Sequence, residues 1–199
     1  MTKIIFKKAD YEYERLRPIV FDMIENLTPN LIKEDTRVLL KPNLLLAAEP
    51  EKAIITHPNL VKAVAEYVIS KGGILQISDS PAIGSFEKII MTGGYKEAFQ
   101  NIDVFFKEFE LSKPIYIGKP FGEIDIAVDA IETDVVINLP KLKTHAQMLL
   151  TLGVKNLFGC IIGYRKPEWH FSSGRRWSRE KRNSKKTRST YRKQKSFCN

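Results

Sequence analysis

The chain is poor in cysteine, since Cys160 and Cys198 are the only two among its 199 residues. Two thiolates cannot complete a four-cysteine zinc site or a 4Fe–4S cluster. A structural disulfide is not expected in a reducing cytosol. Cys160 lies in the apolar stretch Phe-Gly-Cys-Ile-Ile, which predicts a buried structural thiol rather than a reactive one. We therefore expect no four-cysteine zinc site or iron–sulfur cluster made by this chain alone, while His57 and His145 are candidates for proton carriers or metal ligands.

Long hydrophobic runs are also missing. No apolar stretch approaches the roughly 20 residues that a membrane-spanning helix needs. The first residues, Met-Thr-Lys-Ile-Ile, do not resemble a signal peptide. These two observations predict a cytoplasmic protein with no membrane partner.

Three catalytic signatures are absent from the sequence. It contains no GxxxxGK[ST] motif, which excludes a P-loop nucleotide hydrolase. It contains neither a GxGxxG motif after a predicted strand nor a GxSxG nucleophile elbow. Any chemistry must therefore come from another arrangement of side chains, and the sequence does not decide whether the protein is an enzyme.

Positive charge is concentrated at the C-terminal end. The chain carries 32 lysines and arginines, 23 acidic residues and a net charge of +9. Residues 172–199 hold eleven of the basic residues and one acid, which leaves 21 basic and 22 acidic residues in 1–171. The segment 172–199 has too few apolar residues to offset its ordering entropy, so a disordered tail is expected. Residues 1–171 are long enough for one domain with its own core.

The apolar pattern of residues 1–171 predicts an α/β fold with a mostly parallel sheet flanked by helices. Short buried strands are expected at 38–40, 74–77 and 135–139, and a helix that starts at Pro58 and stops at Gly72 lies between the first two. A strand–helix–strand unit of this kind requires a parallel crossover. Further expectations are a helix that starts near Pro18, a strand at 4–6, and an added β-hairpin at 115–128.

Polar side chains follow each of the three predicted strands. Lys41 and Asn43 follow the first strand, Asp79 and Ser80 the second, and a cluster of four residues follows the third: Lys141, Lys143, Thr144 and His145. Ligands of open parallel sheets bind beyond the carboxyl ends of the strands, so these groups are expected to border one pocket. The alternative is a set of ordinary polar loops, since Asp-Ser-Pro is a common turn and a histidine at a helix start is commonly a cap.

Several lysines beside one aspartate favour an anionic ligand, such as a phosphate or a carboxylate. Lys41, Lys141 and Lys143 are the candidates to hold it, with Asp79 to orient it or accept a proton and His145 as the acid–base group. The remaining candidate ligand-binding residues are Asn43, Thr56, His57, Ser80, Thr144, Lys155 and Asn156. Helix N-termini near Thr56 and Ser85 would add backbone donors.

These motifs, taken together, resemble the DUF362 family. The motifs that carry the resemblance are Val-Leu-Leu-Lys-Pro-Asn-Leu at 38–44, Thr-His-Pro at 56–58, Gly-Gly at 72–73, Ser-Asp-Ser-Pro at 78–81, Asn-Leu-Pro-Lys-Leu-Lys-Thr-His at 138–145, and Gly-Val-Lys-Asn-Leu-Phe-Gly at 153–159. The resemblance implies an α/β domain with a shared polar site, and no particular reaction. Because members often carry 4Fe–4S ferredoxin modules, it also implies a possible redox role with a ferredoxin-type partner.

The resemblance covers residues 1–171, which would then form an incomplete domain that ends on an apolar segment at 159–163 without packing partners. The abrupt change to basic sequence indicates a truncated or frameshifted chain, and a genuine nucleic-acid-binding tail is the alternative. The sequence thus supports two functions. One is an anion-binding or redox-associated domain that uses the strand-end residues, and the other is nucleic-acid binding through 172–199.

Overall fold

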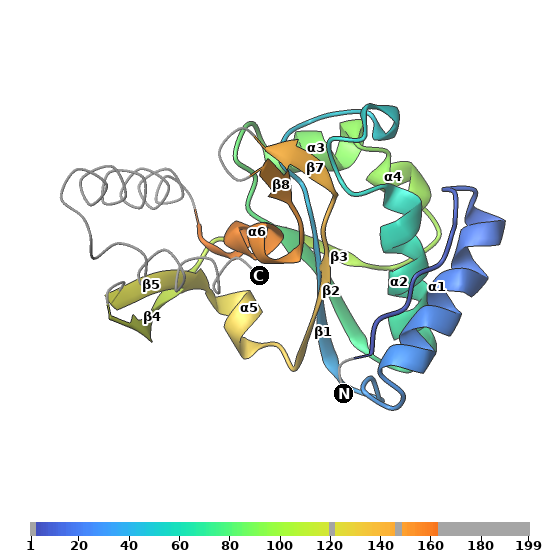
Figure 1. Ribbon diagram of the computed structural model, residues 1–199, viewed down its shortest axis with the longest axis horizontal. Helices are drawn as coiled ribbons and strands as arrows, with labels where there is room; N and C mark the ends of the chain where they lie inside the picture. The colour runs from blue at the N-terminus through green and yellow to red at the C-terminus, as the bar shows by residue number, and fades with distance from the viewer. Residues whose placement is uncertain (1–2, 120–121, 146–148, 163–199) are drawn as a thin grey trace, which may run out of the picture.

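The computed structural model describes residues 3–119, 122–145 and 149–162 (Figure 1). The elements in chain order are α1 (Tyr13–Leu27), β1 (Arg37–Pro42), the 3-10 turn η1 (Pro50–Lys52), α2 (Pro58–Ser70), β2 (Ile74–Asp79), α3 (Phe86–Thr92), α4 (Tyr95–Ala98), β3 (Phe105–Glu108), β4 (Ser112–Gly118), β5 (Gly122–Ala127), α5 (Val128–Glu132), β6 (Val135–Leu139), β7 (Lys143–His145), β8 (Leu149–Thr151), α6 (Gly153–Leu157) and the 3-10 turn η2 (Phe158–Cys160).

Four parallel strands form the central sheet in the order β3-β2-β1-β6. In its register, Leu39 of β1 lies opposite Gln76 of β2 and Val136 of β6. The predicted α/β class is confirmed, as is the prediction that the three strands share one parallel sheet. The antiparallel pair β4–β5 is the predicted hairpin, and β7–β8 is a second antiparallel pair that the sequence did not indicate.

The main core fills one face of the sheet, where α2 packs on β1 and β2 and α1 packs on α2 (Figure 1). Val61 and Val68 of α2 meet Leu40 and Ile77 of the sheet, and all four are fully buried. Burial of each such side chain contributes about 1.5–3 kcal/mol. The helix begins at Pro58 as predicted, and Gly72 follows its end with φ +77°, a conformation that suits glycine.

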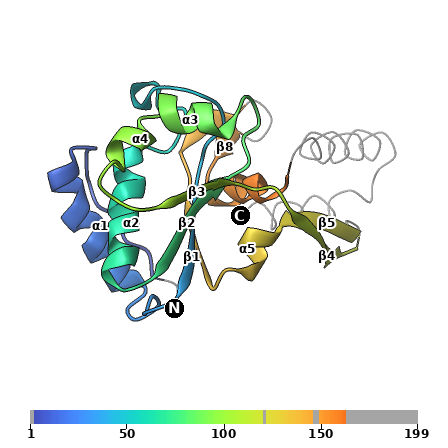
Figure 2. The same ribbon diagram turned by 180° about the vertical axis from the view of Figure 1, so that it is seen from behind.

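A smaller core covers the opposite face, on the side of α5 and α6 (Figure 2). Leu39 of the sheet packs there with Phe109, Ala127 and Cys160. The prediction of a buried Cys160 is confirmed, because its exposed fraction is 8%. The expectation that residues 159–163 lack packing partners is wrong for Cys160 and Ile162, which both belong to this core.

Two expectations for the N-terminal region were wrong. Residues 4–6 form no strand, and Phe6 is 90% exposed, so this segment gains little from burial and lies outside the sheet. The first helix begins at Tyr13, and Pro18 lies inside it. Packing of the buried Leu16 and Val20 against the main core outweighs the local cost of the proline. Within the described residues, no helix combines the length and the apolar character needed to cross a bilayer.

Candidate functional site

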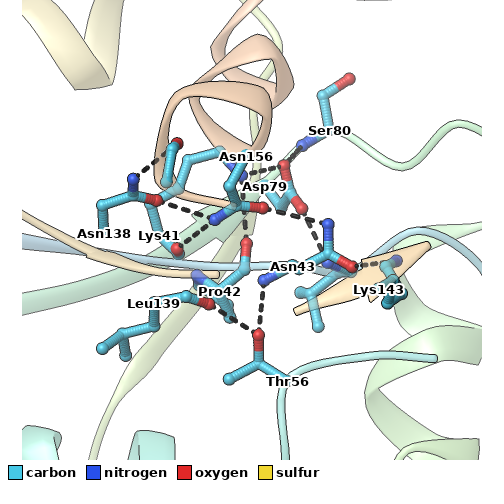
Figure 3. Close-up of polar contacts among 12 residues, drawn as sticks. Lys41, Pro42, Asn43, Thr56, Asp79, Ser80, Asn138, Leu139, Lys143 and Asn156 are labelled. Atoms are coloured by element: carbon cyan, nitrogen blue, oxygen red, sulfur yellow. Dashed lines mark hydrogen bonds and ion pairs between the residues drawn. The ribbon is translucent and has the colours of Figure 1, made fainter. Parts of the chain in front are cut away.

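Five of the strand-end residues, Lys41, Asn43, Asp79, Ser80 and Lys143, lie together at the carboxyl edge of the sheet (Figure 3). Because β2, β1 and β6 run in parallel as neighbours, the chain leaves all three strands at the same edge. Contacts link Lys41, Asn43, Asp79, Lys143 and Asn156 to one another. Two surface hollows of the described residues lie elsewhere, one between α1 and α2 beside Phe21 and Tyr67 and one beside Glu66.

At the centre of the edge lies a buried ion pair between Lys41 and Asp79. The Lys41 Nζ lies 2.6 Å from Asp79 Oδ1 and 3.0 Å from the carbonyl oxygen of Pro42, and the side chain of Lys41 has no exposed surface. Asp79 Oδ1 also accepts from the backbone N–H of Ser80, and Oδ2 accepts from that of Leu44. The pair therefore fixes the loop after β1 against the end of β2, and Lys41 presents no surface to a ligand.

The absence of a side chain at Gly159 allows the η2 turn to bury the Lys41–Asp79 pair. A Cβ at position 159 would lie 2.2 Å from Asp79 Oδ1 and 2.4 Å from Lys41 Nζ. The η2 turn can pass over the ion pair only because residue 159 has no side chain. The last glycine of the motif at 153–159 thus has a steric role in the burial of the pair.

Three asparagines form a directed chain of hydrogen bonds around the pair. Lys143 Nζ donates to Asn43 Oδ1 at 2.7 Å, and Asn43 Nδ2 donates to Asn156 Oδ1 at 3.0 Å. Asn156 Nδ2 donates to the Lys41 carbonyl oxygen and to Asn138 Oδ1, and Asn138 Nδ2 donates to the carbonyl oxygen of Gly153. Each amide is oriented by its neighbour, so the chain holds α6 on β1 and β6 and aims Lys143.

Thr56 connects two of the loops. Its hydroxyl donates to the Leu139 carbonyl oxygen at 2.7 Å and accepts from the N–H of Asn43 at 2.8 Å, and its side chain is buried. The hydroxyl of Tyr95 donates to the Thr56 carbonyl oxygen. Thr56 therefore holds the two loops together, and its buried hydroxyl is not accessible to a ligand. Ser80 is also buried.

The family is shown by comparison with known sequences. A family model described as "Domain of unknown function (DUF362)" matches residues 38–195. The chain belongs to the DUF362 family. The matched range includes most of 172–199, whereas the motifs that we recognised end before Phe171. The truncated or frameshifted origin of the tail stays a prediction, and the tail lies outside the described residues.

A relative with a printed name is the thylakoid-associated protein sll1697 of Synechocystis sp. (strain ATCC 27184 / PCC 6803 / Kazusa). It is 39% identical to this chain over 173 residues, which is 86% of the chain and 54% of the relative. The DUF362 chain therefore spans about half the length of that relative.

Two lysines at this edge of the sheet, Lys143 and Lys155, are half-buried and form no ion pair with a described carboxylate. Lys143 donates to Asn43 and to the carbonyl oxygen of Ile54 at 2.9 Å, and Lys155 lies with its ammonium 5.6 Å from the ring centre of Phe158. Neither forms an ion pair with a described carboxylate. Burial lowers the pKa of both lysines, and the charge of Lys155 lowers that of Lys143 further.

The remaining predicted residues lie at the rim or beyond the described part of the molecule. Lys141 donates to the hydroxyl of Tyr11 at 3.2 Å, and His57 caps α2. Thr144 is exposed on β7, and His145 ends β7 with its side chain outside the description. Sequence reasoning did not name Asn138 as a binding residue, although it opens the motif at 138–145. It missed Tyr11, for which the sequence carries no signal.

The described residues do not fit a metal or an iron–sulfur cluster. Among residues 3–119, 122–145 and 149–162, no three side chains of His, Cys, Asp or Glu are placed to hold an ion. The family's ferredoxin modules need cysteine sets. The two cysteines of this chain cannot supply one, so no step through a cluster is assigned to these residues.

Proposed function

We propose that this DUF362 domain binds a small oxyanion, as a phosphate or carboxylate group, between Lys143 and Lys155 at the carboxyl edge of the sheet. The observation that carries the proposal is a pair of half-buried ammonium groups, neither of which forms an ion pair with a described carboxylate: Lys143 donates to Asn43 and to the Ile54 carbonyl oxygen, and the ammonium of Lys155 lies over the Phe158 ring. Burial lowers the pKa of both, and the charge of Lys155 lowers that of Lys143 further, although Asp79 opposes this. An anion between them would supply the missing counter-charge and accept charge-assisted hydrogen bonds. Lys141, whose charge also lowers the pKa of Lys143, would contribute from the rim.

The buried residues support this site from behind. In the proposal, Lys41 and Asp79 do not touch the ligand, and instead they hold the loop that carries Asn43, which aims Lys143. Asn156 holds α6, on which Lys155 lies. Both cationic groups are thus mounted on a rigid frame, which reduces the ordering cost of binding.

Replacement of Lys143 or Lys155 by Met should weaken binding of phosphate, pyrophosphate or citrate about 10- to 100-fold, because a hydrogen bond to a charged group contributes about 1.5–3 kcal/mol. Isothermal titration calorimetry of the three anions measures this. Lys33→Met is the matched control, since Lys33 is exposed at the opposite edge of the sheet and should bind like the parent. Unchanged affinity in a folded Lys143→Met protein would contradict the proposal.

An enzymatic version of the proposal makes the bound anion a substrate. His145 is then the candidate acid–base group, because it ends the strand that Lys143 begins, and Thr144 is a candidate contact. A redox version needs electrons from a separate ferredoxin-type protein.

The proposal also includes a cytoplasmic location. The relative's name associates that protein with thylakoids, so cell fractionation separates a cytoplasmic from a peripheral membrane location.

A second candidate function is nucleic-acid binding by the tail. The eleven basic residues in 172–199 favour it, because lysine and arginine neutralise phosphates and release counterions. Chain 1–199 should bind single-stranded DNA with an affinity that falls as salt rises, and chain 1–171 should not bind. Filter binding at several salt concentrations measures both. Equal binding by the two chains would exclude the tail as the cause.

A further inference from the structure

The N-terminal segment reaches the rim of the site through Tyr11. The segment runs beside α1, where Lys3 donates to the carbonyl oxygen of Asn26. The Tyr11 ring stacks flat on the His57 ring, with centroids 4.0 Å apart and planes 4° apart. Asn59 Nδ2 donates to the Tyr11 carbonyl oxygen at 2.9 Å, which fixes the backbone of this residue at the start of α2.

Lys141 completes this group. Its Nζ donates to the Tyr11 hydroxyl at 3.2 Å and lies 5.2 Å from the centre of the same ring. The positive charge of Lys141 acts on both sides, since it lowers the pKa of His57 and that of Lys143. Lys141 thus contacts Tyr11 and is within electrostatic reach of both His57 and Lys143.

The hydrogen bonds define the protonation state of His57. Its Nδ1 accepts from the backbone N–H of Asn59 at 3.2 Å, so this nitrogen carries no proton and the neutral ring holds its proton on Nε2. A proton on Nδ1 would abolish the cap of α2. It would also place a second positive charge beside Lys141 and at the positive end of the helix dipole.

We infer that Tyr11 and His57 are positioning residues that hold Lys141 beside Lys143. We call Tyr11, His57 and Lys141 the clasp, and we infer that protonation of His57 opens it. The inference rests on the proposed function for the role of Lys141, while the opening of the clasp is independent of it. The groups that face His57 are Tyr11 from the N-terminal segment, Lys141 from the connection after β6, and Glu51 from η1.

The direction of the pH effect follows from these surroundings. Burial lowers the pKa of His57 and Lys141 lowers it further, while Glu51 opposes them. When the pKa of a base is lower in the folded than in the unfolded chain, the folded state loses stability as the pH falls. The loss begins at the unfolded pKa and is complete below the folded pKa. The clasp is therefore closed at neutral pH and is expected to open below the ordinary histidine pKa of about 6.5.

The test is the affinity for sulfate between pH 8 and pH 5, because sulfate keeps its double charge throughout. Lys141→Gln should weaken sulfate binding about fivefold at pH 8, and acidification of the parent should produce the same loss as His57 titrates. His57→Asn keeps a cap acceptor but loses the ring stack on Tyr11 and cannot titrate, so its sulfate affinity should be lower than that of the parent at pH 8 and should not change as the pH falls. Tyr11→Phe, which lacks only the hydroxyl, should already bind at pH 8 as Lys141→Gln does.

Hydrogen exchange of residues 3–12, followed over the same pH range, decides the clasp without reference to binding. After correction for intrinsic rates, protection should fall with the titration of His57 in the parent and not in His57→Asn. Constant protection in the parent would overturn the clasp. Sulfate affinity that rises on acidification would overturn the positioning role, because His57 would then act as an added cation. Absence of sulfate binding at pH 8 would overturn the proposed function and the role of Lys141 together. The hydrogen-exchange measurement would still show whether protonation of His57 opens the clasp.

Discussion

Replacement of Lys41 by Met is expected to lower the free energy of unfolding by about 3–5 kcal/mol, the loss typical when one partner of a buried ion pair is removed. The side chain of Lys41 has no exposed surface, and the Asp79 carboxylate is 5% exposed, so water cannot replace the lost ammonium. Among the described residues, the backbone N–H groups of Leu44 and Ser80 would remain as donors to the carboxylate. Urea denaturation measures the change.

The double variant Lys41→Met/Asp79→Asn should be more stable than Lys41→Met alone, because the amide carries no buried charge, although its single oxygen can accept from only one of the two N–H groups. Lys52→Met is the control for an exposed ion pair, since Lys52 and Glu49 are both largely exposed, and it should change stability by less than about 1 kcal/mol. A loss for Lys41→Met as small as that of the control would show that the pair is accessible to water.

Gly159→Ala is the second change with a large expected effect. The added methyl would occupy the space of Asp79 Oδ1 and Lys41 Nζ, so η2 must lift from the ion pair or the pair must separate. Overpacking of a tight interior commonly costs about 1–3 kcal/mol, and exposure of the pair adds to it. The expected result is a loss at or above the upper end of that range, measured by urea denaturation.

The same motif supplies the control. A Cβ at Gly153 would meet Asn138 Nδ2 at 3.4 Å, an ordinary contact distance. Gly153→Ala should therefore change stability by no more than about 0.5 kcal/mol. Equal effects of the two substitutions would mean that the cost arises from backbone freedom and not from the close approach of η2 to the ion pair.

The sequence predicted the parts of the fold that have strong local signals. The apolar pattern between Pro58 and Gly72 predicts α2, and the short apolar runs at β1, β2 and β6 predict a parallel sheet. The β7–β8 pair was missed because strands of three residues are too short to show alternation. The strand expected at 4–6 did not form, because a short apolar run does not reveal whether the sheet offers it a place.

The meeting of the strand-end side chains was predictable from the sequence, and the environment of each side chain was less so; that these residues bind a ligand stays a prediction. Strand-end placement identified the edge correctly, because parallel neighbours direct their ends to one side. Strand-end placement could not show that Lys41 is buried against Asp79 while Lys143 is half-buried, because in the sequence each is simply a lysine that follows a predicted strand. The burial of Lys41 depends on Gly159, which lies more than a hundred residues away in the sequence. The backbone at Gly159 covers the Lys41–Asp79 pair. Tyr11 reaches the rim by the path of the N-terminal segment, which no local pattern encodes.

The central claim is that Lys143 and Lys155 share a bound oxyanion, and the most direct test is NMR titration of their side-chain carbons in the presence and absence of pyrophosphate. Without the anion, both lysines should titrate below the ordinary value of 10.5, as their burial requires. With pyrophosphate, both pKa values should rise, because a bound anion stabilises the charged form, while Lys33 should be unaffected. Titration of Lys143 and Lys155 at unchanged pKa values with pyrophosphate present at saturating concentration would contradict the account.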